Sequence, residues 1–167
     1  NNGVIDVASI LKESSNIGIT KLVLNLKPSD LCDTYQRFGF GWTTNSGFPG
    51  ENSGSLSLPR SDQAFVLATM SFGYGVTVTP LQLAHAYAII GAGGIKRPIS
   101  YLKLDEAPVG ERVISADVAR QVIEMLSLAV EHRGSNARVD GYRVAGKTGT
   151  ALKVGKDGYE KGKYRAM

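Results

Sequence analysis

The residues best suited to chemistry lie near the end of the chain, in the segment 141–151, which reads Gly-Tyr-Arg-Val-Ala-Gly-Lys-Thr-Gly-Thr-Ala. In an extended segment alternate side chains point to opposite faces, and glycine inside a strand often marks the close approach of a ligand or another backbone. The ammonium of Lys147 and the hydroxyls of Thr148 and Thr150, beside bare backbone at Gly149, suit an extended peptide that carries a carboxylate. Taken alone, the segment is more simply explained as an ordinary strand with a solvated lysine and a glycine bulge.

A second polar cluster, Ser14-Ser15-Asn16, lies far upstream. Apolar residues recur at helical spacing before and after it, which predicts one helix over 4–13 and another over 19–26. The cluster then occupies a tight connection that both helices hold rigidly, as a site residue requires. By itself, the cluster is more simply explained as helix capping by Ser14 or Asn16, because these residue types favour helix ends.

The middle of the chain alternates predicted helices with irregular segments. Residues 41–60 are rich in Gly, Ser, Asn and Pro, which indicates a long surface loop. The segment 79–82 (Thr-Pro-Leu-Gln) opens a helix with a capping box and a proline in its first turn. Residues 98–104 alternate well enough for a strand, and Ser115 caps a further helix before the lysine segment. This order of elements indicates an α+β or α/β fold with helices packed on a sheet.

The composition is that of a globular segment rather than a disordered one. The chain has 167 residues, of which 43% are hydrophobic and 20% charged, with a formal net charge of +4, and it is long enough for one domain with a sizeable core. The basic residues are scattered, so no nucleic-acid interface is predicted. The single cysteine, Cys32, excludes an internal disulfide and is expected to be buried. His85 and His132 are far apart with no ligand spacing, so neither a metal nor a cofactor is expected.

Motifs in a fixed order give the sequence a resemblance to a known family. The pair S-x-N and K-T-G is typical of penicillin-recognising serine enzymes. The sequence resembles the class B penicillin-binding proteins, and among them the septal (cell-division) peptidoglycan transpeptidases of Gram-negative bacteria. The resemblance extends over nearly the whole chain and is carried by Ser14-Ser15-Asn16, Phe72-Gly73-Tyr74-Gly75, the segment 78–84 (Val-Thr-Pro-Leu-Gln-Leu-Ala) and the segment 141–151.

The resemblance implies a fold and a reaction. The fold is α+β, part of a penicillin-binding-protein/β-lactamase-like serine transpeptidase domain in which helices pack on an antiparallel sheet. In the reaction a serine attacks the penultimate D-Ala carbonyl of a stem peptide, D-Ala leaves, and an amino group of a neighbouring stem takes the acyl group. β-Lactams mimic D-Ala-D-Ala and acylate the same serine.

The resemblance also assigns roles to residues of this sequence. Ser14, Asn16 and Lys147 match the catalytic positions: the serine passes a proton toward the leaving amine, the asparagine holds the substrate amide, and the lysine supplies positive charge. The substrate-binding positions are Thr148, Gly149, Thr150 and Tyr74. For Tyr74, packing in the core is an equally good interpretation.

One part of the family pattern does not fit. The family's nucleophile is the serine of an S-x-x-K motif on a separate helix upstream of S-x-N. Ser9-Ile10-Leu11-Lys12 matches the letters, but it lies on the predicted helix that leads directly into Ser14 and therefore cannot face that residue across a cleft. We expect residues 1–167 to be a partial transpeptidase domain that lacks the upstream nucleophile motif and the C-terminal strands, and to be inactive alone.

The resemblance implies partners and a location as well. The ligands are peptidoglycan stem peptides ending in D-Ala-D-Ala and β-lactams, and the protein partners are divisome membrane proteins including a septal glycosyltransferase. The catalytic domain is expected in the periplasm, anchored at the cell inner membrane. Two alternatives remain open at this point: a related carboxypeptidase, β-lactamase or β-lactam sensor with the same acyl-serine chemistry, and an inactive scaffold that keeps the fold.

Overall fold

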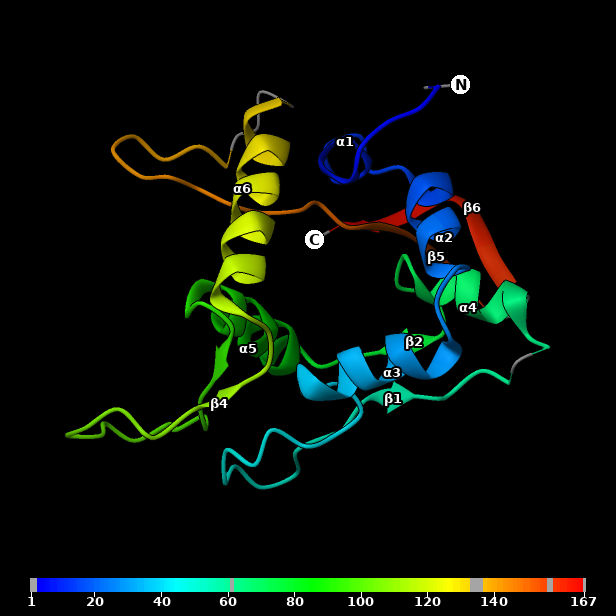
Figure 1. Ribbon diagram of the computed structural model, residues 1–167. Helices are drawn as coiled ribbons and strands as arrows, with labels where there is room; N and C mark the ends of the chain where they lie inside the picture. Colours follow the sequence, from blue (N-terminus) through cyan, green and yellow to red (C-terminus); the bar gives the residue numbers. More distant parts are fainter. Residues whose placement is uncertain (1–2, 61, 133–136, 156–157, 167) are drawn as a thin grey trace.

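The computed structural model describes residues 3–60, 62–132, 137–155 and 158–166. Over these ranges the chain forms short helices and pairs of antiparallel strands (Figure 1). In chain order the elements are α1 (Val7–Lys12), α2 (Asn16–Val23), α3 (Pro28–Arg37), β1 (Ser55–Leu56), α4 (Ala64–Met70), β2 (Val76–Thr77), α5 (Pro80–Gly91), β3 (Ile95–Lys96), β4 (Glu111–Arg112), α6 (Ala116–His132), β5 (Thr150–Gly155) and β6 (Gly158–Ala166).

The first two helices are separated by a connection of a few residues, as the sequence predicts. α1 begins where Asp6 accepts a hydrogen bond from the backbone N–H of Ser9 at 2.8 Å. α2 begins three residues earlier than its apolar pattern suggests, because the Ser15 hydroxyl caps it by accepting from Gly18 N at 3.1 Å. Capping therefore belongs to Ser15, which leaves Ser14 and Asn16 on either side of the cap.

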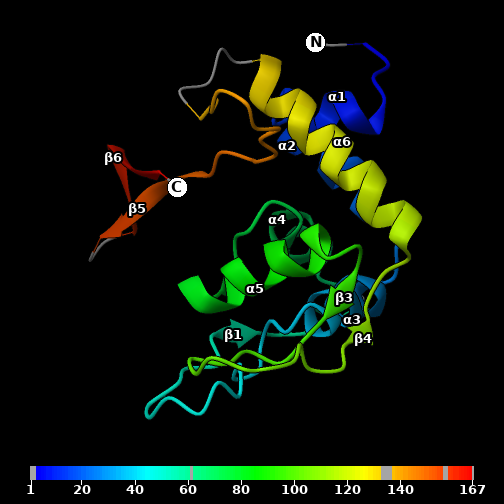
Figure 2. The same ribbon diagram turned by 90° about the vertical axis from the view of Figure 1, so that its left-hand side faces the viewer.

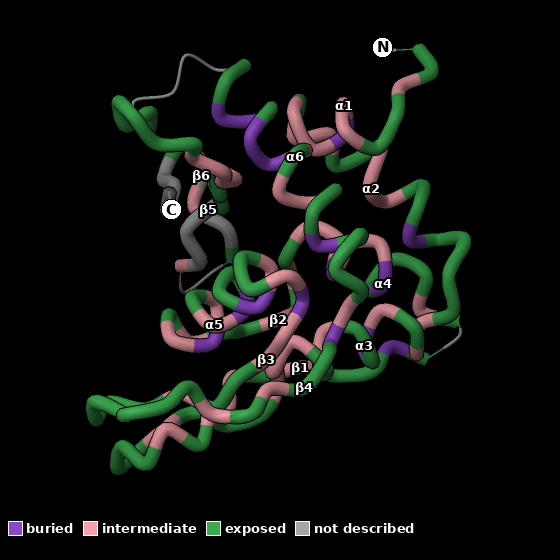
Figure 3. The backbone as a smooth tube through the Cα atoms, turned by 60° about the vertical axis from the view of Figure 1, so that its left-hand side comes forward, coloured by how far each residue is buried: buried purple, intermediate pink, exposed green. Residues whose placement is uncertain are grey.

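The core is built between helices that are distant in sequence. α1 and α5 both pack against α6, and α2 packs against α4. Figure 3 shows the buried positions concentrated on these inner helix faces, with the long loops exposed. The predicted burial of Cys32 is confirmed, and burial raises the pKa of its thiol. The buried apolar residues are Ile10, Val23, Cys32, Leu67, Met70, Ala86, Ile89, Val113, Ala119, Leu126, Ala129 and Val130.

The start of α5 confirms the predicted capping box and adds a connection that the sequence does not reveal. The Thr79 hydroxyl accepts from Gln82 N at 3.1 Å, and the Gln82 side-chain oxygen accepts from Thr79 N at 2.7 Å. The Gln82 side chain is only 1% exposed, and its nitrogen donates to the carbonyl oxygens of Trp42 at 2.7 Å and Ser53 at 2.8 Å. One buried amide thus ties the helix to the long loop between α3 and β1.

The predicted strand over 98–104 is wrong. The strand that forms is β3, which ends at Lys96 and pairs with β4 in the register Ile95↔Arg112. Pro98 has no N–H to offer a ladder. Leu102 is 80% exposed, so the alternating apolar side chains of this segment do not form a buried face that would fix its pairing with another strand.

Two long loops lie beside each other at one end of the molecule. Residues 41–54 and 97–110 run alongside each other in Figure 2. The rings of Phe48 and Tyr101, one from each loop, meet edge to face with their centroids 5.8 Å apart. The predicted surface loop over 41–60 is confirmed except at Ser55–Leu56, which forms β1 and pairs with β2.

The α+β class is confirmed, with the described strands divided among two-stranded antiparallel sheets. The longest is the β5–β6 hairpin, in the register Thr150↔Ala166 to Gly155↔Gly158, and it projects away from the helices in Figure 2. The strand predicted over 141–151 begins only at Thr150, so Lys147 lies in the unpaired segment that leads into β5. Within the described residues, no helix combines the length and hydrophobicity needed to span a bilayer.

Candidate active site

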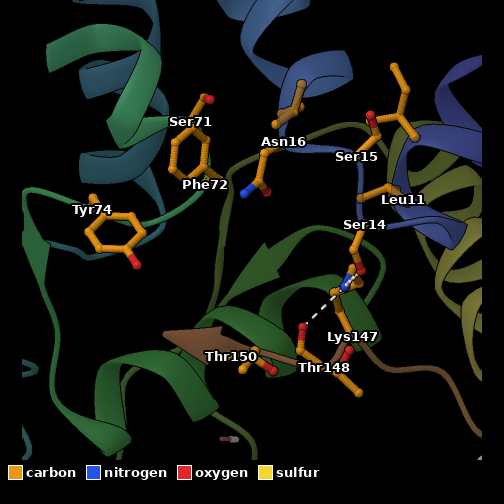
Figure 4. Close-up of a pocket in the computed structure, with 13 residues that line it drawn as sticks. Leu11, Ser14, Ser15, Asn16, Ser71, Phe72, Tyr74, Lys147, Thr148 and Thr150 are labelled. Carbon is orange, nitrogen blue, oxygen red and sulfur yellow. Dashed lines mark hydrogen bonds between the residues drawn. The ribbon is translucent and has the colours of Figure 1, made fainter. Parts of the chain in front are cut away.

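A groove of about 510 Å³ lies between the α1–α2 connection, the end of α4 and the segment before β5. The two sides of the groove are remote in sequence, and Figure 4 shows their polar side chains turned toward the shared space. Its lining residues are Ile10, Leu11, Ser14, Ser15, Asn16, Ile19, Ser71, Phe72, Tyr74, Lys147, Thr148, Gly149 and Thr150. Every site residue predicted from the sequence is therefore part of one concave surface.

The central contact of the groove joins Ser14 to Lys147. The lysine ammonium donates a hydrogen bond to the serine hydroxyl across a sequence separation of 133 residues, and a second one to the carbonyl oxygen of Thr148 at 3.0 Å. Figure 4 shows the two side chains pointing at each other. A cation in direct contact with a hydroxyl can hold or pass a proton at that oxygen.

The backbone of Ser14 has an unusual conformation that supports this contact. Its φ is 52°, in the left-handed region that side-chain-bearing residues rarely adopt. This conformation costs about 1 kcal/mol. It persists because the neighbouring amides are bonded: Ser14 N donates to Leu11 O at 3.2 Å and Ser15 N to Ile10 O at 2.9 Å. The end of α1 thus fixes the turn that carries the hydroxyl.

The position of Lys147 depends on α6, which the sequence analysis did not identify as part of the site. Gly146 N donates to Leu126 O on α6 at 3.3 Å. Arg143 Nε lies 3.3 Å from the hydroxyl of Ser127, which is buried on the same helix. Because α1 packs on α6 as well, this helix sets the separation between Ser14 and Lys147. Main-chain bonds of this kind leave no residue pattern in a single sequence.

The remaining polar groups surround the contact. Asn16 is the first residue of α2, and its amide extends into the groove in Figure 4. Thr148, Gly149 and Thr150 line the other side. A hydroxyl, an amide, an ammonium and two further hydroxyls on one concave surface can bind an anionic peptide end and stabilise negative charge that develops beside it.

Tyr74 lies at the groove and is only partly buried. Its ring meets that of Phe72 edge to face, with centroids 5.7 Å apart. Of the two interpretations of Tyr74, lining the groove describes its position better than packing in the core. Phe72 and Ser71 line the same groove and were not singled out from the sequence as site residues.

The S-x-x-K match on α1 does not contribute to the groove. Of the described residues of α1, Ile10 and Leu11 line it, whereas Ser9 and Lys12 do not. The backbone N–H of Ser9 takes part in the N-terminal cap of the helix, and Lys12 Nζ lies 4.0 Å from a carboxylate oxygen of Glu13. No three His, Cys, Asp or Glu side chains within the described ranges are grouped to hold a metal ion.

Comparison with proteins of known sequence and structure gives a consistent result. The chain is 47% identical over 164 residues to the peptidoglycan D,D-transpeptidase FtsI of Escherichia coli (strain K12), covering 97% of this chain and 28% of that protein. It is 42% identical over 152 residues to the probable peptidoglycan D,D-transpeptidase PenA of Neisseria flavescens, covering 90% of this chain and 38% of that protein.

Among solved structures, the apo structure of the TP domain from Burkholderia pseudomallei penicillin-binding protein 3 matches with a TM-score of 0.90 and 39% sequence identity. The match covers 99% of this chain and 51% of that chain. The chain thus spans about half of that solved domain and well under half of the two relatives above. Since the model of the penicillin binding protein transpeptidase domain matches residues 1–167, the chain belongs to the penicillin-binding protein transpeptidase domain family.

Proposed function

We propose that these 167 residues are part of a peptidoglycan D,D-transpeptidase that cross-links stem peptides through an acyl-serine intermediate and is a target of β-lactams. The observation that carries the proposal is the contact between the Lys147 ammonium and the Ser14 hydroxyl inside a groove that also exposes Asn16. The E. coli relative is named a peptidoglycan D,D-transpeptidase and the Neisseria flavescens relative a probable one, which supports the same chemistry.

In the proposed reaction the nucleophilic serine forms a bond to the carbonyl carbon of the penultimate D-Ala, and the bond to the terminal D-Ala nitrogen breaks. The leaving amine needs a proton at that moment. Ser14 supplies it by donating its hydroxyl proton, and Lys147, in contact with the same oxygen, replaces it. The proton that the attacking serine loses on forming the ester returns to Lys147, so the protons balance over the step. Asn16 orients the substrate amide. In the second half of the cycle an amine of a neighbouring stem attacks the ester, and the relay runs in reverse.

The segment before β5 holds the substrate in this proposal. The hydroxyls of Thr148 and Thr150 bind the terminal carboxylate, and Gly149 leaves the backbone open to the extended peptide. The backbone N–H of Thr150 stabilises the oxyanion, a type of contact worth about 3–4 kcal/mol in the transition state. Tyr74 forms an aromatic wall of the groove beside Phe72.

We further propose that the acylated serine belongs to a part of the protein outside this chain. Coverage of 28% of the E. coli relative and 51% of the solved domain leaves room for that residue and for further strands. By the same reasoning the full-length protein is a cell-division enzyme at the inner membrane with its catalytic domain in the periplasm. Its partners are divisome membrane proteins including a septal glycosyltransferase.

Labelling of the full-length protein with a fluorescent penicillin, followed by peptide mapping, tests the proposal. The expected result is one covalent adduct on a serine outside residues 1–167, with hydrolysis much slower than acylation. An adduct on Ser9 would overturn the assignment of the nucleophile. Rapid release of hydrolysed drug would indicate a β-lactamase, and absence of labelling an inactive scaffold.

A further inference from the structure

A second cleft, of about 610 Å³, lies away from the proposed catalytic residues, among the end of α3, the loop after it, the start of α5 and the β3–β4 pair. None of the proposed catalytic or substrate-binding residues lines it. Its volume is within the range of small-molecule sites. Most of its lining side chains are polar, and an indole, that of Trp42, stands among them.

Trp42 combines a fixed backbone with a free ring. Its carbonyl oxygen accepts the buried Gln82 amide at 2.7 Å, so the main chain is tied to α5. The residue is nevertheless 62% exposed. Burying a large aromatic side chain is strongly favourable, so an indole held in solvent by a buried hydrogen bond marks a surface suited to a ligand.

The loop that follows Trp42 is organised before any ligand binds. The carboxylate of Glu51 accepts from Thr44 Oγ1 at 3.0 Å, from Asn45 N at 3.0 Å and from Ser46 N at 2.7 Å, and also bonds the Ser46 hydroxyl. These hydrogen bonds lower the pKa of Glu51, and the bond from the Ser46 hydroxyl contributes most. Ordering a loop in advance reduces the entropy lost on binding.

Two of the three charged side chains that line the cleft are paired with each other. Lys96 Nζ lies 3.5 Å from a Glu111 carboxylate oxygen and donates to the carbonyl oxygen of Arg37 at 3.1 Å, so its charge is already neutralised locally. His85 Nε2 lies 2.8 Å from the Arg97 carbonyl oxygen and closes the gap between α5 and β3. The cleft keeps one further cation, the exposed Arg97, and otherwise offers a ligand neutral amides and hydroxyls beside the apolar surfaces of Phe38, Trp42, Pro98 and Val109.

We propose that this cleft binds a polysaccharide of N-acetylated amino sugars, the glycan to which stem peptides are attached. A pyranose ring has an apolar face that packs on an indole, and its hydroxyl and acetamido groups bond to side chains such as those of Gln36, Thr43 and Asn45. The choice of this glycan rests on the proposed function, because a transpeptidase acts on peptides carried by such strands. The cleft holds the strand while the peptide is processed in the groove.

Calorimetric titration of the full-length protein with a peptide-free β-1,4-linked N-acetylglucosamine tetrasaccharide tests the inference. Saturable binding is expected, weakened about 10-fold or more by Trp42→Ala through loss of the stacking surface. Asn45→Gly is a second variant that is compatible with the φ of 53° at this position, so it removes the amide without backbone strain and should also weaken binding. The matched control is Phe65→Ala, which removes an aromatic ring that is 79% exposed on α4, outside the cleft.

Equal affinity of the Trp42→Ala variant and the unmodified protein, or no saturable heat, overturns the inference, provided that the unfolding temperatures of both agree. Binding of a sugar-free stem peptide that is lost in Trp42→Ala overturns it in favour of a peptide site. Penicillin labelling of the unmodified protein tests the proposed function separately. Labelling without saccharide binding overturns only the glycan cleft, and saccharide binding without labelling overturns only the proposed function.

Discussion

The two clefts of this chain are held together in different ways. The groove around Ser14 and Lys147 joins segments 133 residues apart, and its two sides meet because each is attached to α6. The cleft beside Trp42 is held by a buried amide at its base and one carboxylate within its loop. The groove is therefore sensitive to changes in helix packing, whereas the cleft depends on individual polar side chains.

This difference has a physical origin. Close-packed helices transmit strain to one another, so a side chain displaced between them disturbs both sides of a groove built on them. A loop held by directional hydrogen bonds either keeps its geometry or loses it when a donor is removed. Substitutions chosen in each region should therefore separate catalytic effects from effects on stability, and we order them by the size of the expected change.

The largest effect is expected for Lys147→Ala in the full-length protein. Removal of the ammonium that contacts Ser14 leaves the hydroxyl without its proton donor. Acylation by a fluorescent penicillin should slow about 100- to 1,000-fold, which corresponds to about 3–4 kcal/mol of transition-state stabilisation. The measurement is the second-order labelling rate. Lys103→Ala, at an exposed position in the loop 97–110, is the matched control and should label at the normal rate; equal rates for both variants would remove Lys147 from the mechanism.

The next effect is expected for Gln82→Ala, which attacks the base of the other cleft. The substitution leaves the carbonyl oxygens of Trp42 and Ser53 and the N–H of Thr79 without their partner. Because these groups are near a fully buried side chain, the free energy of unfolding should fall by about 3 kcal/mol. Urea unfolding of the full-length protein measures the loss of stability. The signal is the fluorescence of Trp42, obtained by subtracting the emission of the Trp42→Phe protein. Gln36→Ala, on the exposed surface of α3, should change stability by less than about 0.5 kcal/mol.

A smaller effect is expected for Gly18→Ala in α2. Its control, Gly91→Ala in α5, should change the free energy of unfolding in the opposite direction. At Gly18 of α2 an added Cβ would lie 2.7 Å from Ile10 Cγ1, so the buried isoleucine has to move. Overpacking outweighs the better helix propensity of alanine, and stability should fall by about 1 kcal/mol. Acylation should slow several-fold as well, because the displaced residue lies next to the turn that carries Ser14.

At Gly91, the last residue of α5, an added Cβ meets nothing within 4 Å. Gly91→Ala should therefore raise stability by about 0.5–1 kcal/mol and leave acylation unchanged. If both glycine variants change stability in the same direction, the sensitivity of the groove to helix packing does not come from the Ile10 contact.

Features of the fold that depend on residues close in sequence were predicted correctly, whereas a feature that depends on a distant partner was not. The capping box at Thr79 and the short connection between the first two helices are local, and the residue types alone predict both. Only Asn16 differs from the prediction, because it begins α2 instead of lying in the connection. The strand predicted over 98–104 fails because strand formation needs a partner, and β3 pairs with β4 before Pro98 interrupts the ladder. Alternation of side chains along one segment contains no information on such a partner.

The candidate site shows the same limit. Its residue types were recognised from motifs, and the structure places those residues around one groove. The hydrogen bond from Gly146 to α6 and the left-handed turn at Ser14 were not predicted, because the first is a main-chain contact and the second is unusual for serine. The cleft beside Trp42 was missed entirely, since its key donor, Gln82, reads in sequence only as a capping residue.

The smallest predicted effect concerns Glu51 and pH. Its pKa is lowered from the ordinary value of 4.5, chiefly by the hydrogen bond from the Ser46 hydroxyl. A carboxylate with a lowered pKa stabilises the folded loop above the ordinary value, and this contribution is lost as pH falls through the lowered pKa. In the protein labelled with ¹⁵N-Asn and ¹⁵N-Ser, the amide signals of Asn45 and Ser46 should shift with a midpoint below pH 4.5. The Glu51→Gln variant should show no such transition. A midpoint at or above 4.5 in the unmodified protein would mean that the loop is not organised by this carboxylate, and the contrast between a cleft held by polar side chains and a groove held by helix packing would no longer hold.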